Sequence, residues 1–107
     1  MIEFDLKIQH HFSDGIYAKK MEIPKDHYVV SHKHTYDHLS ILASGRVLVE
    51  VGDVTTEYEA PACINILAGT HHSIFALEDA YWYCLHATSE TDIAMIDNVL
   101  IEEQPCR

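Results

Sequence analysis

The chain of 107 residues has the usual length of one domain, and 48% of its residues are apolar, which excludes a disordered chain. Seven Lys and Arg against 17 Asp and Glu give a formal net charge of −10, so the surface repels nucleic acid phosphates and anionic membranes. We therefore expect a single domain over residues 1–107 with no nucleic acid partner.

Short strands separated by turn residues account for most of the chain. Segment 15–23 has apolar positions at Ile16 and Ala18, and at Met21 and Ile23 after a change of phase. The predicted strands are, in chain order, 15–23, 28–31, 37–44, 46–51, 54–59, 62–67, 73–77 and 81–87. Strands that recur every 8 to 12 residues or so, with turns between them, indicate an antiparallel sandwich or barrel.

Only the C-terminal segment is predicted as a helix. Asp92 favours the positive end of a helix, and an apolar stripe follows it. The stripe consists of Ile93, Ile96, Val99 and Leu100. We expect this short α-helix to pack across an open end of the barrel or along a partner subunit.

The sequence has neither a run of apolar residues long enough to span a membrane nor the pattern of a signal peptide. Its three cysteines, Cys63, Cys84 and Cys106, are too widely spaced for a metal-binding pair or a secreted disulfide framework. We therefore expect no membrane association and a cytoplasmic location.

Nine histidines occur in the chain, and several have the spacing of a metal site. Histidine is the commonest metal ligand. His32 and His34 point to the same side of an extended chain, and His38 has the same parity. Beyond Gly69, either His71 or His72 faces them, because adjacent residues on a strand point to opposite faces.

The first group of histidines belongs to a longer pattern. His32-Lys33-His34, three residues, His38, six residues and Gly45 resembles the first conserved motif of the cupin superfamily. The family usually has a glutamate ligand where His38 stands. A variant subgroup of cupins uses sites made only of histidines, and this chain resembles that subgroup.

The second cupin motif reads Gly, five residues, Pro-x-Gly, two residues, His. Gly69 and His72 stand at its last two positions, so the resemblance favours His72 over His71 as a ligand. Leu67 replaces the proline of the motif, and Pro61 replaces its first glycine. Both replacements change turn chemistry and leave the ligand positions occupied.

The resemblance implies a small cupin β-barrel, a double-stranded β-helix of jelly-roll type, that forms a homodimer. It also implies one divalent transition metal ion (Fe, Mn, Ni, Cu or Zn) held by His32, His34, His38 and His72. Four neutral imidazoles leave the charge of the ion uncompensated, which favours a small anionic or enolisable oxygenated ligand.

Two functions follow from such a site. One is a mononuclear metal-dependent enzyme, either a dioxygenase-like oxidoreductase or an isomerase or lyase. The alternative is a non-catalytic, metal-dependent module that binds or senses a small molecule. A third possibility is a structural or interaction protein that keeps the barrel for assembly.

Further residues are predicted to line the substrate pocket or to surround the metal ligands. They are Tyr36, Ser40, Trp82, Cys84 and His86. His86 shares one face of the last strand with Trp82 and Cys84, and it is either a contact of the site or a hydrogen-bonded core histidine. Cys84 would act as a nucleophile only with a lowered pKa. His10, His11 and His27 are expected to be solvated.

Overall fold

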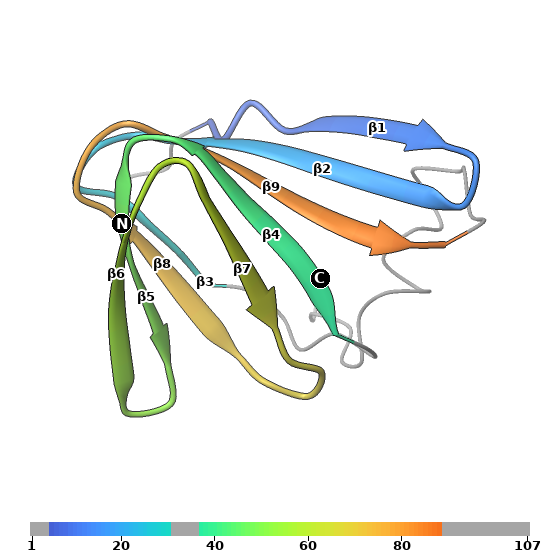
Figure 1. Cartoon of the computed structure of the whole chain (residues 1–107). Helices are drawn as coiled ribbons and strands as arrows, with labels where there is room; N and C mark the ends of the chain where they lie inside the picture. The colour runs from blue at the N-terminus through green and yellow to red at the C-terminus, as the bar shows by residue number, and fades with distance from the viewer. Residues whose placement is uncertain (1–4, 31–36, 89–107) are drawn as a thin grey trace.

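The computed structural model describes residues 5–30 and 37–88, and these form nine β-strands (Figure 1). The strands are β1 (Gln9–Ser13), β2 (Ile16–Ile23), β3 (Tyr28–Val30), β4 (His38–Ser44), β5 (Arg46–Val51), β6 (Val54–Glu59), β7 (Ala62–Ile66), β8 (His72–Ala76) and β9 (Ala80–Ala87). In this part of the chain the structure is all-β, and it holds no helix that is long and apolar enough to cross a membrane.

The strands pair into two antiparallel sheets. One has five strands in the order β1-β2-β9-β4-β7, and the other has four in the order β3-β8-β5-β6. In Figure 1 the sheets meet where β4 turns into β5 and β8 into β9, and they separate toward the end where β4 begins. We call that second end the open end.

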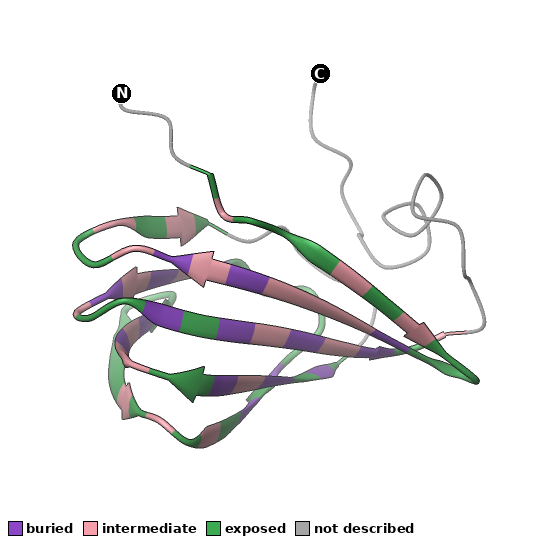
Figure 2. Cartoon of the chain, turned by 90° about the horizontal axis from the view of Figure 1, so that it is seen from above, coloured by how far each residue is buried: buried purple, intermediate pink, exposed green. Residues whose placement is uncertain are grey.

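The hydrophobic core lies between the sheets, because alternate residues of each strand point inward. Buried and exposed residues alternate along the strands in Figure 2. Leu42, Val47 and Trp82 are fully buried, and Ile74 is nearly so. Full burial of such a side chain stabilises the fold by about 1.5–3 kcal/mol.

The eight predicted strands are all present, with each described boundary within one residue of its expected position. The remaining strand, β1, was not predicted, because Gln9–Ser13 is mostly polar and forms a sheet edge that pairs with β2 alone. The predicted C-terminal helix lies outside the described residues. The single domain over residues 1–107 stays a prediction.

The expected change of phase in β2 is wrong. β2 pairs with β9 without interruption from Ile16 to Ile23, so one set of alternate residues faces inward throughout. That set contains Tyr17, Lys19, Met21 and Ile23. Ile16 lies on the outer face, and 44% of its surface is exposed. The prediction took the apolar Ile16 and Ala18 as the inward residues of the first half of β2. The inward residues there are instead a tyrosine and a lysine, so apolar character alone did not identify the inner face.

Candidate metal centre

Three histidines are buried at the open end of the fold. His38 begins β4, His72 begins β8 and His86 is the penultimate residue of β9. Their exposed fractions are only 4%, 3% and 3%, respectively. Since β4 and β9 belong to one sheet and β8 to the other, both layers contribute an imidazole to this end.

The rings of these histidines lie close to one another. The ring centroids of His38 and His86 are 4.3 Å apart, and those of His38 and His72 are 6.5 Å apart. The register of β4 with β9 places Leu39 opposite Leu85, so His38 and His86 are neighbours across the strand pair on its inner face. The shorter contact is therefore made within one sheet, and the longer one joins the two sheets.

Hydrogen bonding orients the ring of His38. Its Nδ1 donates a hydrogen bond to the backbone carbonyl oxygen of Leu39 over 3.3 Å. In this tautomer Nδ1 carries the proton, and Nε2 has the free lone pair that can bind a metal ion. Metal-bound histidines commonly donate their second ring N–H to a carbonyl in this way. In His72 the buried Nδ1 has no hydrogen-bond partner among the described residues.

Burial also sets the charge of both rings. Loss of hydration lowers the pKa of His38, partly offset by the Leu39 carbonyl and the negative charge of Asp37. Burial, together with smaller contributions from the neighbouring His38 and His71, lowers the pKa of His72 to about 4. Both imidazoles are therefore neutral at pH 7, which is the form that binds a metal ion.

Comparison with known proteins identifies the fold. No protein-family model and no curated protein sequence matches the chain. Solved structures do match it. A cupin-2 domain protein from Shewanella frigidimarina is 13% identical, with 81% of this chain and 85% of that chain covered and a TM-score of 0.66. The chain has the cupin fold.

Two further structures agree. A cupin 2 domain-containing protein from Halorhodospira halophila is 14% identical, with coverages of 92% of this chain and 77% of that chain and a TM-score of 0.67. An RmlC-like cupin with a double-stranded β-helix, from Methanocaldococcus jannaschii, is 9% identical, with coverages of 77% and 79% and a TM-score of 0.66. At these identities the likeness is one of fold alone.

The cupin barrel exposes His71 and buries His72, so the two adjacent histidines do face opposite ways. His32 and His34, the other two expected ligands, lie outside the described residues, as does Tyr36. Within residues 5–30 and 37–88, no three His, Cys, Asp or Glu side chains come together closely enough to hold an ion. The four-histidine ligand set therefore stays a prediction.

Three of the predicted pocket residues lie in the interior of the barrel. Ser40 and Trp82 are fully buried, and the Ser40 hydroxyl donates to the sulfur of Cys84 over 3.9 Å. Burial raises the pKa of the Cys84 thiol, which opposes its use as a nucleophile. Trp82 and Cys84 belong to the hydrophobic core cluster, and their part in a substrate pocket stays a prediction.

Surface hollows reach the histidines from two sides. One contains His38 and His86, with Leu39 and Leu85 among its other walls. The other contains His72, next to the exposed His71. A small molecule can therefore approach this end of the barrel from the rim.

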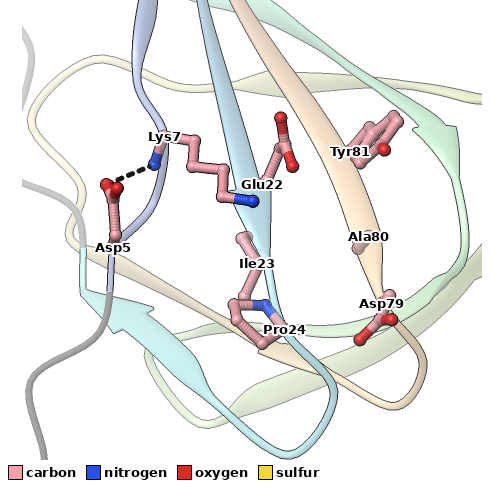
Figure 3. Close-up of a pocket in the computed structure, with 8 residues that line it drawn as sticks. All are labelled: Asp5, Lys7, Glu22, Ile23, Pro24, Asp79, Ala80 and Tyr81. Carbon is pink, nitrogen blue, oxygen red and sulfur yellow. Dashed lines mark hydrogen bonds between the residues drawn. The ribbon is translucent and has the colours of Figure 1, made fainter.

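A third hollow lies at the opposite end of β2 and β9 (Figure 3). Its walls are Asp5, Lys7, Glu22, Ile23, Pro24, Asp79, Ala80 and Tyr81. The Asp5 and Asp79 carboxylates accept hydrogen bonds of 2.8 Å from the backbone N–H groups of Lys7 and Lys25. Because these carboxylates already accept hydrogen bonds that stabilise the local loops, they do not indicate a binding site in this hollow.

Two residues near the histidines were missed from the sequence. Tyr17 is 2% exposed, and its hydroxyl shares a hydrogen bond of 2.7 Å with Nδ1 of His10. The Tyr17 ring also stacks against His86, with centroids 6.0 Å apart. His10 was expected to be solvated, but it is half-buried because β1 places it beside β2. Strict alternation back from Met21 and Ile23 would have found Tyr17.

Proposed function

We propose that this cupin barrel is a mononuclear, metal-dependent enzyme that acts on a small anionic or enolisable oxygenated molecule. His32, His34, His38 and His72 hold one divalent transition metal ion. The proposal rests on one observation above all. His38 and His72 are buried, neutral imidazoles that come from different sheets and lie at the same end of the barrel.

Burial of an imidazole is costly unless its polar atoms find partners. A structural histidine meets this cost with hydrogen bonds, but Nδ1 of His72 has none among the described residues. A metal ion at the open end gives a buried ring nitrogen a partner. Imidazole donors suit iron, copper, nickel and zinc, and manganese less selectively.

The ion and the residues around it have different roles at this site. When bound, the ion supplies Lewis acidity and a positive charge for anionic oxygen atoms. The Leu39 carbonyl holds the His38 ring in one orientation. Lys19 lies on the inner face opposite Cys84, whose thiol experiences its positive charge, and we propose that this charge also attracts an anionic substrate. An oxygenase-like reaction, an isomerisation or a lyase reaction on a small acid or dicarbonyl compound fits this arrangement.

Elemental analysis tests the metal site. The protein is purified without a histidine tag, and its metal content is measured beside that of His34→Ala and of His11→Gln. His11 is exposed on β1 and serves as the matched control. We expect His34→Ala to lose stoichiometric metal while its far-ultraviolet circular dichroism stays that of a folded β-barrel. Unchanged metal content in that variant would contradict the assignment.

A second experiment separates the enzyme from the alternative, a non-catalytic binding or sensing module. The iron(II)-loaded protein is screened in an oxygen electrode against enolisable acids and diketones, with product analysis for isomerisation and cleavage. Turnover supports the enzyme. Tight binding without any conversion supports the binding module.

The cupin resemblance also leads us to propose a homodimer. The two sheets end in the edge strands β1, β7, β3 and β6. Light scattering after size exclusion measures the oligomeric state directly, and a monomer over the working concentration range would refute this part.

A further inference from the structure

The closest pair of imidazoles in the described structure is not the pair that the cupin motifs predict. His86 lies on β9, outside both motifs, and its ring centroid is 4.3 Å from that of His38. The motif residue His72 is farther from His38, at 6.5 Å. The last strand therefore brings one more imidazole to the candidate site.

These spacings can be compared with those around a bound ion. Imidazole nitrogens bind transition metals at about 2.1 Å, which puts two ring centroids roughly 4.5 Å apart for adjacent ligands at a right angle. The His38–His86 spacing of 4.3 Å fits adjacent ligands. His72, whose ring centroid is 6.5 Å from that of His38, does not complete a three-ligand group with them in the described structure.

Packing restricts where the His86 ring can lie. The ring stacks on Tyr17 at an interplanar angle of 22°. Tyr17 is held in turn by its hydrogen bond to His10 and by the ring of Phe12, whose centroid is 4.9 Å away. Aromatic side chains from β1 and β2 thus form a wall behind His86, and that wall keeps it beside His38.

A purely structural role for His86 is the competing explanation. An apolar residue would fill the same inward position of β9 without the cost of burying an imidazole. Trp82 and Cys84 occupy the equivalent inward positions earlier in the strand and belong to the hydrophobic core. Only at the end of β9, where the strand passes the other two buried histidines, does a titratable ring replace them.

We propose that His86 is a direct metal ligand, adjacent to His38 in the coordination sphere, and that Tyr17 is the positioning residue that holds its ring. This inference rests on the proposed metal site and extends it to a strand that neither motif covers. Its consequence is that the ion has one fewer open position for a substrate than the four motif histidines alone would leave.

Metal affinity by itself cannot test this proposal, because loss of a group that only supports a ligand also weakens binding by about 10–100-fold. The measured quantity is therefore the ¹⁵N chemical shift of each histidine ring nitrogen. Uniformly ¹⁵N-labelled wild-type protein is titrated with Zn²⁺, and the histidine rings are followed in long-range ¹H–¹⁵N spectra. His86→Asn confirms the assignment of the His86 signals, and His11→Gln is the control.

We expect one ring nitrogen of His86 to move to the position of zinc-bound imidazole together with one of His38, at one equivalent of zinc. Zinc affinity, measured against a competing chelator, falls about 10-fold or more in His86→Asn and stays unchanged in His11→Gln. In Tyr17→Phe, which breaks the bond to His10, the same His86 nitrogen still shifts but its signal broadens.

The outcomes separate the two proposals. If the His38 nitrogen shifts and neither His86 nitrogen does, His86 is not a ligand, and the proposed metal site stands without it. If the wild-type protein takes up no zinc, iron, copper, nickel or manganese, the proposed function fails and this inference falls with it. The wild-type titration decides the question even if His86→Asn does not fold.

Discussion

Gly45 occupies the turn between β4 and β5, and its replacement by alanine probes the joint between the two sheets. Its φ is +90°, in the region that favours glycine. A Cβ at this position would overlap the backbone carbonyl oxygen of Asp79 and would lie 3.0 Å from the Cα of Ala80. Both obstacles are backbone atoms, so no side chain can rotate to make room.

Two costs add in Gly45→Ala. A left-handed backbone costs a non-glycine residue about 1–2 kcal/mol. Overpacking that forces backbone shifts adds about 1–3 kcal/mol. The displaced turn also carries hydrogen bonds between the strands, since the Gly45 carbonyl accepts from Ala60 N–H over 3.0 Å and the Arg46 carbonyl from Leu77 N–H over 2.8 Å. We expect a loss of about 2–5 kcal/mol in the free energy of unfolding.

Gly52→Ala is the matched control. Gly52 also has a positive φ, +59°, but a Cβ there would meet nothing within 4 Å. It should therefore lose only the backbone cost of about 1–2 kcal/mol. Urea unfolding of the metal-free variants, followed by Trp82 fluorescence, measures both losses. Equal destabilisation of the two variants would refute the reasoning that the turn at Gly45 is confined by Asp79 and Ala80.

Two further predictions concern charge at the open end. Because burial lowers the pKa of His72 to about 4, below its unfolded value near 6.5, the metal-free protein keeps full stability above pH 6.5 or so and loses up to about 3 kcal/mol as the pH falls toward 4. Urea unfolding at pH 7 and pH 4.5 checks this, and a pH dependence that is the same in His72→Leu would contradict it. Lys19→Met should weaken oxalate binding to the zinc-loaded protein about 5-fold, for an interaction of about 1 kcal/mol. Lys20→Met is the control, since Lys20 lies on the outer face beside Glu22 and Tyr81, and an equal loss in both variants would refute a specific role.

Much of the fold is predictable from local pattern. The alternation at Val47, Val49 and Val51 and the turn at Gly52 define β5 and its hairpin with β6, because side-chain direction in a strand has a period of two. The same rule predicts that one of His71 and His72 faces inward. It fails at β1 and over the first half of β2, because His10, Tyr17 and Lys19 carry polar groups on inward positions and so hide the pattern.

The sequence by itself determined eight of the nine described strands, the turns between them and the histidines with the spacing of a metal site. Tertiary structure alone decided which strands lie next to one another, and therefore that His86 contacts His38 and that Tyr17 stacks behind it. The physical reason is that strand alternation assigns a side chain to a face of its own strand only. Its neighbours across the sheet depend on pairing between segments that are distant in the chain, and here the β4–β9 register makes that choice.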